Sequence, residues 1–138
     1  MTVDPALLEE AYPLQEHLGF TITDWHKGFS RIEVPLAPFL MNRQGLPHGG
    51  VHATLLDSAM GFAGCYTGDP SVRQMALTLS LTVNYVAQAK GTRLIATGRH
   101  TGGGRKTYFA EGRVEDELGT RIATATGVFR YRGLGSTP

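Results

Sequence analysis

The stretch of sequence that decides the fold spans residues 42–65 and reads NRQGLPHGGVHATLLDSAMGFAGC. After the double glycine, residues 51 to about 65 contain no proline, few charges and many Ala, Leu, Met and Gly residues. This composition predicts one helix that is apolar nearly all round. We therefore expect a central, buried helix around which the other segments of the chain are arranged.

The predicted helix carries two ionisable side chains, His52 and Asp57. Four of its apolar residues, Val51, Leu55, Ala59 and Phe62, form one stripe. At about 100° per residue, Asp57 points roughly the opposite way. An unpaired buried carboxylate is costly, so Asp57 is either functional or satisfied by a partner at a helix–helix or subunit contact.

The residues that open the helix supply backbone N–H groups. His48, Gly49 and Gly50 lie where unpaired donors and the helix dipole attract negative charge. An oxyanion site and a carboxylate within about three turns of each other are the ingredients of acyl transfer. The functional interpretation of Asp57 is therefore that of a reactive carboxylate.

Length and charge limit the class of protein. The chain has 138 residues, enough for one core, so we expect a single domain over residues 1–138. The formal net charge is +1, which marks the surface neither for nucleic acid nor for an anionic membrane. No apolar run approaches the roughly 20 residues of a membrane span, and the first residues do not resemble a signal peptide. The expected location is the cytoplasm.

Two kinds of segment precede the motif. Residues 5–18 predict a short helix or two, interrupted at Pro13, that cover an open end of the fold. Residues 20–25 and 29–36 alternate between apolar and polar side chains, which predicts a hairpin. Pro35 is expected to restrict the second strand to an edge or a bulge.

The clearest alternation of the chain follows the helix, at residues 76–86. Its apolar face consists of Leu77, Leu79, Leu81, Val83 and Tyr85. Its polar face consists of Thr78, Ser80, Thr82 and Asn84. This pattern predicts one strand on which Thr78 shares the polar face, toward solvent or an interface.

Three further alternating runs follow, at residues 92–100, 106–115 and 121–132. The small residues Ala123, Ala125 and Gly127 would let the last strand lie close to the helix. One helix and strands joined by tight turns predict an α+β fold, in which an antiparallel sheet wraps around one long helix.

Other chemistries have weaker support. His48 and His52 are four residues apart and could face one metal, but no Glu follows the first His and no third ligand is evident, so no metal site is predicted. No Ser lies in a Gly-x-Ser-x-Gly elbow, and Ser58 is expected to pack. The single cysteine, Cys65, is expected to behave as a small hydrophobic residue.

The pattern Asn42-x-x-Gly45-x-x-His48-Gly49-Gly50, followed by Asp57 in an Ala-rich helix and by a long alternating strand, resembles the hot-dog-fold acyl-CoA thioesterases of the phenylacetate-pathway type. The resemblance extends from about residue 40 to the end of the chain. It implies a hot-dog fold of the α+β class and hydrolysis of an acyl-CoA thioester to a free acid and coenzyme A, without a cofactor.

The resemblance also implies roles for individual residues. Asp57 either activates a water molecule or attacks the carbonyl itself, and the Gly49 N–H polarises that carbonyl. Asn42 holds the water or the loop, and His48 orients the carbonyl or supports the loop. Thr78 matches a position at which a hydroxyl assists the carboxylate.

Three residues are assigned to substrate binding. Gly50 lies beside the oxyanion donor, and Arg105 and Lys106 follow three glycines. A P-loop joins a strand to a helix, whereas both sides of this run predict strands, so a glycine turn with solvated charges is the alternative. If the ligand is an acyl-CoA, its phosphates need cations near the mouth of the site, and Arg105 and Lys106 are the candidates.

The site is expected to be shared between subunits. Because the Asp57 side of the helix is also apolar, a second copy of the chain is the expected cover for it. The resemblance implies a homodimer or a homotetramer built as a dimer of dimers, in which Asn42, His48 and Gly49 of one subunit face Asp57 of the other.

Two other functions stay open at this point. One is a hydratase or dehydratase of the same fold that acts on a CoA-bound or carrier-bound enoyl group. The other is a non-catalytic acyl-CoA sensor. Which acyl group is bound is not determined by the residues, and the resemblance alone favours an aromatic acyl group of the phenylacetyl type.

Overall fold

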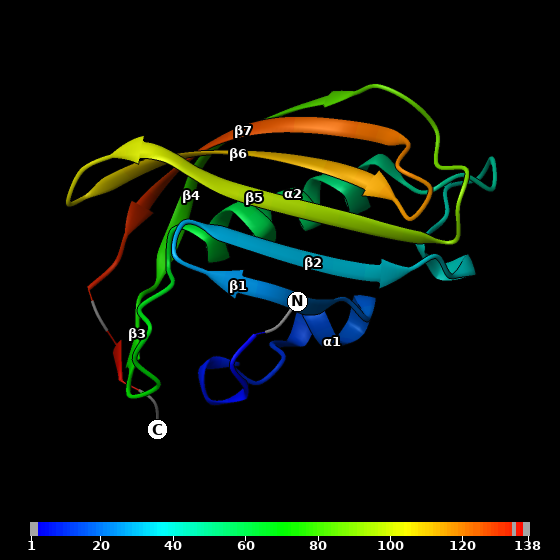
Figure 1. Ribbon diagram of the computed structural model, residues 1–138. Helices are drawn as coiled ribbons and strands as arrows, with labels where there is room; N and C mark the ends of the chain where they lie inside the picture. Colours follow the sequence, from blue (N-terminus) through cyan, green and yellow to red (C-terminus); the bar gives the residue numbers. More distant parts are fainter. Residues whose placement is uncertain (1–2, 134, 137–138) are drawn as a thin grey trace.

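A computed structural model describes residues 3–133 and 135–136. One long helix, α2, is covered by a curved six-stranded antiparallel sheet, as Figure 1 shows. The strand order is β1-β2-β5-β6-β7-β4. The strands are β1 (Thr21–His26), β2 (Phe29–Pro35), β4 (Ala76–Tyr85), β5 (Arg93–Gly103), β6 (Thr107–Asp116) and β7 (Arg121–Tyr131). The predicted α+β architecture of a sheet around one helix is confirmed.

Helix α2 spans Gly49–Ala63, so it begins and ends two residues earlier than expected. It begins early because His48 has an extended backbone and its ring caps the first turn, with Nδ1 accepting the Gly50 N–H at 2.8 Å. Both glycines of the double-glycine motif therefore belong to the helix and do not precede it.

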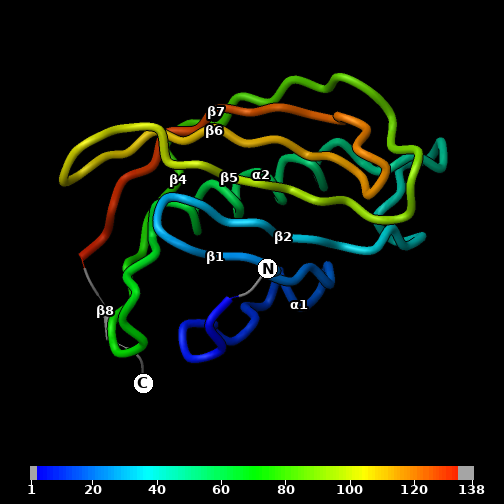
Figure 2. The backbone as a smooth tube through the Cα atoms, viewed as in Figure 1, coloured from blue at the N-terminus to red at the C-terminus, as the bar shows by residue number. Residues whose placement is uncertain are grey.

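The N-terminal segment forms two short helices beside β1, a 3-10 helix η1 (Pro5–Leu7) and helix α1 (Pro13–Leu18), which Figure 2 shows as a tube. Pro13 is the first residue of α1, where its missing N–H costs nothing. The hairpin of β1 and β2 is confirmed. The expectation for Pro35 is wrong, because β2 lies between β1 and β5 and Pro35 is simply its last residue.

The hydrophobic core lies between α2 and the inner face of the sheet. The closest approach is at Gly98 of β5, where an added Cβ would overlap the backbone of Ala59 and Met60. Ala123 and Ala125 of β7 are buried in the same core, as their small size suggested. The largest buried side chains are Tyr108, Phe20, Phe129, Ile32, Leu40, Leu55, Leu56, Met60, Leu94 and Ile122.

The second half of α2 is anchored by side chains from three strands. Ser30 of β2 donates its hydroxyl to the Ala59 carbonyl at 2.6 Å. Trp25 of β1 donates Nε1–H to the Phe62 carbonyl at 2.8 Å, and the hydroxyl of Tyr108 on β6 lies 3.1 Å from the Met60 carbonyl. The Met60 and Phe62 carbonyls are among the last four of α2, which lack partners four residues further on, so the Trp25 and Tyr108 donors help to satisfy them. Together with the Ser30 contact, they fix the helix end against the sheet.

Strand β4 contains a bulge, and the predicted division of its faces is therefore wrong. Thr78 is paired with Phe129 of β7 and Ser80 with Val128, so Leu79 is the extra residue between them. A bulge exchanges the faces on either side of it. As a result Thr78 shares the inner face with Phe129, and the side chains of Leu77 and Leu79 are more than half exposed.

Two carboxylates at the β6–β7 turn hold the long connection between β4 and β5. Asp116, which is almost fully buried, accepts the Lys90 and Gly91 N–H groups at 2.8 and 3.0 Å. Its other oxygen accepts the N–H groups of Leu118 and Thr120 at 3.0 and 2.9 Å. Burial acts to raise the pKa of Asp116, but the N–H donors outweigh it and hold the pKa well below its ordinary value.

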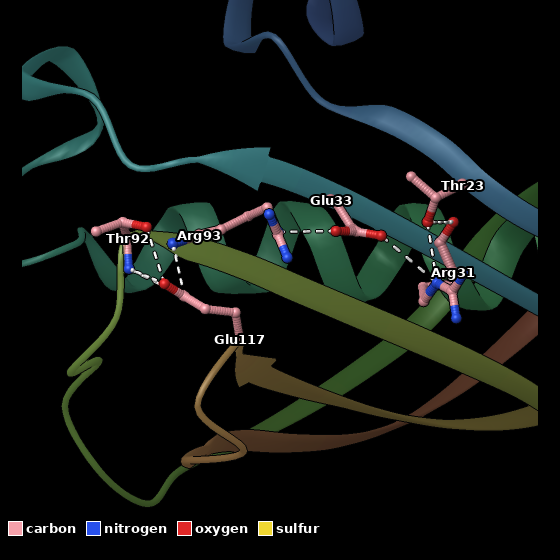
Figure 3. Close-up of polar contacts among 6 residues, drawn as sticks. All are labelled: Thr23, Arg31, Glu33, Thr92, Arg93 and Glu117. Atoms are coloured by element: carbon pink, nitrogen blue, oxygen red, sulfur yellow. Dashed lines mark hydrogen bonds and ion pairs between the residues drawn. The ribbon is translucent and has the colours of Figure 1, made fainter. Parts of the chain in front are cut away.

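Glu117, the next residue, holds the end of the same connection between β4 and β5. Its carboxylate accepts the Thr92 and Arg93 N–H groups and the Thr92 hydroxyl, as Figure 3 shows. These hydrogen bonds, first of all the one from the Thr92 N–H, lower the pKa of Glu117 to about 2. The same view shows Glu33 between Arg93 and Arg31, with its carboxylate 2.9 Å from the Arg93 Nε. These contacts fix the end of the sheet that is remote from the β5–β6 turn.

The remaining elements are short. The 3-10 helix η2 (Pro38–Leu40) leads into the double-glycine loop, and β3 (Val72–Arg73) pairs with β8 (Gly135–Ser136) in a separate two-stranded sheet. Within the described residues, no helix has both the length and the apolar composition that crossing a membrane requires.

Candidate active site

Asp57 and Thr78 form the centre of the candidate site. Asp57 lies in the middle of α2 and is half-buried, and the Thr78 hydroxyl donates a hydrogen bond of 2.6 Å to its Oδ1. The bulge in β4 makes this contact possible, because it turns Thr78 toward the helix. The structure thus joins two residues that the sequence had singled out separately. The other oxygen of the carboxylate accepts no hydrogen bond from residues 3–133 or 135–136.

Asp57 and Thr78 open into a cavity of about 250 Å³. Most of its lining is apolar or small, and it also includes Ser58 next to Asp57 and Glu9 and Tyr12 from the N-terminal segment. The Tyr12 hydroxyl lies 2.9 Å from the Ser58 hydroxyl. The role of Tyr12 was missed from the sequence, and the expectation that Ser58 only packs is incomplete. No local signal connects residues 46 positions apart.

The oxyanion candidates lie at the N-terminus of α2. The Gly50 N–H is used by the cap from His48, whereas the Gly49 N–H makes no hydrogen bond within the described part of the chain. Because the helix dipole adds positive charge at this end, the Gly49 N–H is available to a negatively charged group. His48 therefore supports the loop. Of the two glycines, Gly49 is the one whose backbone N–H is not already used within the described residues.

Tyr85 is a further residue at this end of the helix, and it was not predicted. Its hydroxyl donates to the Gly49 carbonyl at 2.7 Å, and its ring lies against the Gly49 Cα. An added Cβ on Gly49 would lie 3.3 Å from the ring, tighter than most real contacts. Glycine at this position therefore permits the approach of Tyr85, which holds the first helical peptide in place from the end of β4.

Asn42 shapes the loop that leads to the helix. Its side-chain oxygen accepts the N–H groups of Gln44 and Leu46 at 2.9 and 3.2 Å. The Asn42 N–H in turn donates to the Leu46 carbonyl at 2.7 Å. The resemblance implied that Asn42 holds either a water molecule or the loop. These contacts account for the second role. Its amide nitrogen is the part of the side chain that remains for a water or a ligand.

Asp57 and Gly49 of the same chain are too far apart to act on one carbonyl group. They are eight positions apart on a continuous helix, which corresponds to about 12 Å along the axis at about 1.5 Å per residue. Thr78 and Tyr85, the β4 residues that contact them, are likewise separated along the strand. The structure brings Asp57 together with Thr78, and Gly49 with His48 and Tyr85, as two half-sites.

Arg105 and Lys106 lie in the turn between β5 and β6, and both are exposed. The strands on either side of this run exclude a P-loop, as the sequence predicted. Neither residue forms an ion pair with another described residue. The Lys106 carbonyl accepts the Tyr131 N–H at 2.8 Å, and Tyr131 pairs with Ala76 of the cavity wall. The turn therefore lies at the end of the sheet nearer to Asp57.

The other reactive groups of the helix have environments that fit structural roles. Burial lowers the pKa of His52, so this imidazole is neutral at pH 7, while His48 is exposed and occupied by its cap. Burial raises the pKa of Cys65 to about 11, so its thiol is a poor nucleophile at neutral pH. No cluster of three or more His, Cys, Asp or Glu side chains that could hold a metal occurs in residues 3–133 and 135–136.

The family model described as "Thioesterase superfamily" matches residues 44–123, more than half of the chain. The chain belongs to the thioesterase superfamily. The matched residues contain the double-glycine loop, α2 and strands β4 to β6, which supply most of the two half-sites. As a member of this superfamily with the hot-dog fold, the protein is a thioester hydrolase.

Individual relatives are more distant. The chain is 26% identical over 130 residues to the medium/long-chain acyl-CoA thioesterase YigI of Escherichia coli, with 85% of this chain and 84% of YigI covered. The structure of BH2602 from Bacillus halodurans with CoA is 29% identical, with a TM-score of 0.77 and coverage of 91% and 82%. PaaI from the E. coli phenylacetic acid degradation operon has a TM-score of 0.76 at 19% identity, covering 89% and 86%. The likeness to PaaI shows the shared fold.

Proposed function

We propose that this thioesterase hydrolyses an acyl-CoA, with Asp57 as the general base or nucleophile and the helix N-terminus as the oxyanion site. The observation that carries the proposal is the hydrogen bond from Thr78 to Asp57 in the wall of a mostly apolar cavity. A carboxylate held by one donor keeps an oxygen free for chemistry, and the cavity beside it can take an acyl group. The names of YigI and of the CoA complex of BH2602 support an acyl-CoA as the substrate.

The reaction needs few groups because the leaving group is good. A water oxygen bonds to the thioester carbon and gives its proton to the free oxygen of Asp57, while the carbonyl electrons move to the oxyanion. When the oxyanion collapses, the C–S bond breaks, and the thiolate leaves with the electron pair and takes the proton from Asp57. With a thiol pKa of about 8.5, this departure needs little help. If Asp57 attacks directly, a mixed anhydride forms first and water then hydrolyses it.

The oxyanion donor is supplied by a second subunit. Along β4, Thr78 is level with Asp57 and Tyr85 is level with Gly49. A two-fold axis crossing β4 between these two residues would place the Asp57 of one chain beside Gly49 of the partner subunit. Asn42 and His48 would then shape the loop that each subunit presents to the other. The two half-sites would form two complete sites in a dimer.

The free edge of β4 supports this arrangement. Among the described strands, β4 pairs only with β7, so its other edge presents unpaired backbone groups along ten residues. The side chains of Leu77, Leu79 and Tyr85 on this strand are 54%, 58% and 57% exposed. A second copy that pairs along this edge would cover them. We propose a homodimer that can associate further into a dimer of dimers, with residues 1–138 acting as one catalytic domain.

A thiol-release assay over a panel of acyl-CoAs tests the reaction. Release of free coenzyme A thiol with formation of the acid is expected from the purified protein. A hydratase or an acyl-CoA sensor of the same fold would release no thiol, so this result would reject the proposal. The panel also identifies the acyl group that is cleaved. The cytoplasmic location, which is expected for an enzyme that acts on coenzyme A esters, stays a prediction.

Complementation between inactive subunits tests the shared site. Asp57→Asn and Asn42→Ala chains are each expected to be nearly inactive as homodimers. In a purified mixed dimer, one site collects both defects and the other collects neither, so activity should recover toward half that of the native dimer. Mixed dimers as inactive as their parents would show that the site lies within one chain.

The charges of the β5–β6 turn are proposed to bind the phosphates of coenzyme A. Changing Arg105 and Lys106 together to Ala should raise KM for an acyl-CoA by several-fold and leave KM for the corresponding acyl-pantetheine thioester unchanged. The reason is that only acyl-CoA carries the nucleotide phosphates. Equal effects on both substrates would show that these residues make no phosphate contact. Arg113→Ala, on the outer face of β6, is the matched control for loss of a surface cation.

A further inference from the structure

The N-terminal segment forms part of the wall of the Asp57 cavity. Of the cavity residues, Glu9 and Tyr12 come from this segment, and the others come from α2, the β3–β4 region and β7. Tyr12 reaches the helix, where its hydroxyl lies 2.9 Å from the hydroxyl of Ser58. Ser58 is the neighbour of Asp57 in the chain, so the contact closes the cavity next to the candidate reactive group.

Tyr12 is held in this position from both sides. Pro13 follows it and restricts its backbone to the extended conformation, with φ −80° and ψ 164°. Its ring makes an edge contact with the buried Phe20, with ring centroids 6.0 Å apart. Burial raises the pKa of Tyr12, and the charge of Asp57 raises it further, so the hydroxyl stays protonated and can donate.

The rest of this segment is only loosely attached to the fold. Between the buried residues Val3 and Gln15, most side chains are exposed, and those of Leu7 and Glu9 are half-buried. Within this stretch, the side-chain hydrogen bond that reaches another element is the one between Tyr12 and Ser58. Tyr12 therefore links the N-terminal segment to α2 by a side-chain hydrogen bond.

We infer that Tyr12 is a specificity-determining residue, which closes the acyl end of the cavity and limits the length of the acyl chain. The inference rests on the proposed function, because it takes this cavity as the acyl site. The cavity measures about 250 Å³, and the Tyr12 side chain forms part of its wall. Removal of the Tyr12 ring would widen the cavity at this point and make room for a longer acyl chain.

The substrate class also follows from the charges of the wall. Asp57 and Glu9 are both carboxylates that line this cavity. A second carboxylate on the acyl group would add negative charge to a cavity that already holds these two. The site thus favours acyl groups with uncharged ends over dicarboxylic ones.

The test compares acyl chains of different length on four proteins. kcat/KM is measured for hexanoyl-CoA and dodecanoyl-CoA with the native protein and with Tyr12→Ala, Tyr12→Phe and Leu14→Ala. Tyr12→Ala should raise the ratio of dodecanoyl to hexanoyl turnover by about tenfold, since a few methylenes of pocket space are worth this much. Tyr12→Phe keeps the ring but removes the hydroxyl that contacts Ser58, so it should raise the ratio by a smaller factor. Leu14 is half exposed on α1 and outside the cavity, and its variant should keep the native ratio.

Two outcomes would overturn the inference. An unchanged ratio in Tyr12→Ala would show that the residue does not limit chain length. An equal change in Leu14→Ala would show that loosening of the whole segment, and not Tyr12, is responsible.

A second measurement separates this inference from the proposed function. If the native protein releases no thiol from any acyl-CoA, the proposed reaction is wrong, and the cavity can still be probed without it. Calorimetric titration with hexan-1-ol and decan-1-ol, which carry neither a thioester nor a charge, then gives the length preference directly. Tyr12→Ala should strengthen binding of decan-1-ol relative to hexan-1-ol, and the same preference in both proteins would reject the role of Tyr12.

Discussion

Two buried or half-buried aspartates in this protein have opposite surroundings. Asp116, the last residue of β6, accepts four backbone N–H groups, two with each oxygen, from the β4–β5 connection and from the β6–β7 turn. Within the described part of the chain, Asp57 accepts one hydrogen bond, from Thr78, and lines a cavity. The first carboxylate has its acceptor capacity used by the fold, whereas the second keeps an oxygen for a ligand.

The number of hydrogen-bond donors around a carboxylate separates a structural role, as for Asp116, from the reactive role proposed for Asp57. N–H donors stabilise the charged form of Asp116 and lower its pKa, which makes it a poor proton acceptor. A base must be able to take up a proton, so a saturated carboxylate is unsuited to catalysis. If this distinction holds, changes at Asp57 alter turnover and changes at Asp116 alter stability.

The largest effect is expected from Asp57→Asn. The amide is nearly isosteric but can neither accept a proton nor attack, so kcat should fall by a factor of about 100 or more. The thermal midpoint should stay near that of the native protein, because only one hydrogen bond is involved. Thiol-release kinetics together with thermal unfolding check both parts. Near-native turnover would reject the role of Asp57.

Asp116→Asn should show the reverse pattern. The amide of Asn has one acceptor oxygen in place of the two that Asp116 uses, so two part-buried N–H donors lose their acceptor. We expect the Tm to fall by about 5 °C or more, with kcat at a temperature well below Tm within about twofold of the native value. Differential scanning calorimetry and the thiol-release assay measure the two quantities. A large loss of kcat in the folded variant would erase the distinction between the two aspartates.

Thr78→Val tests the single donor to Asp57. Valine keeps the shape and removes the hydroxyl, so the carboxylate loses its orientation, and kcat should fall by about tenfold. Ser80→Ala on the same strand is the matched control, because Ser80 lies beyond the bulge and is exposed. Equal losses in the two variants would mean that β4 is damaged in general and that the Thr78 contact has no special role.

The smallest effect concerns pH. Glu117 has a pKa of about 2 in the folded protein against an ordinary 4.5, and the pKa of Asp116 is also lowered. Their stabilisation is complete above the ordinary pKa values and is lost as the pH falls toward the lowered ones. The Tm of the native protein should therefore decrease between about pH 5 and pH 2, and Glu117→Gln should flatten part of this decrease. Tm measured across this range checks it, and parallel curves would show that Glu117 contributes nothing.

The two aspartates also show how far the sequence can be interpreted by itself. Asp57 was identified because a charge on an apolar helix is conspicuous, and the helix itself follows from composition over residues 51–65. Asp116 lies between the predicted strands 106–115 and 121–132, where an acidic residue is ordinary and gives no signal. Its partners, Lys90 and Gly91, lie in another loop that the sequence does not connect with it.

The sequence by itself determined the helix, the strands and their antiparallel class, because each rests on a local period of about 3.6 or 2 residues. Tertiary structure decided the face of Thr78, because a bulge depends on how β4 pairs with β7 and not on the alternation within β4. It also decided that β2, which ends at Pro35, lies between two other strands, that Tyr85 holds Gly49 and that Tyr12 contacts Ser58. Each of these contacts joins segments far apart in the chain, and their geometry is fixed only when the helix and the sheet pack together.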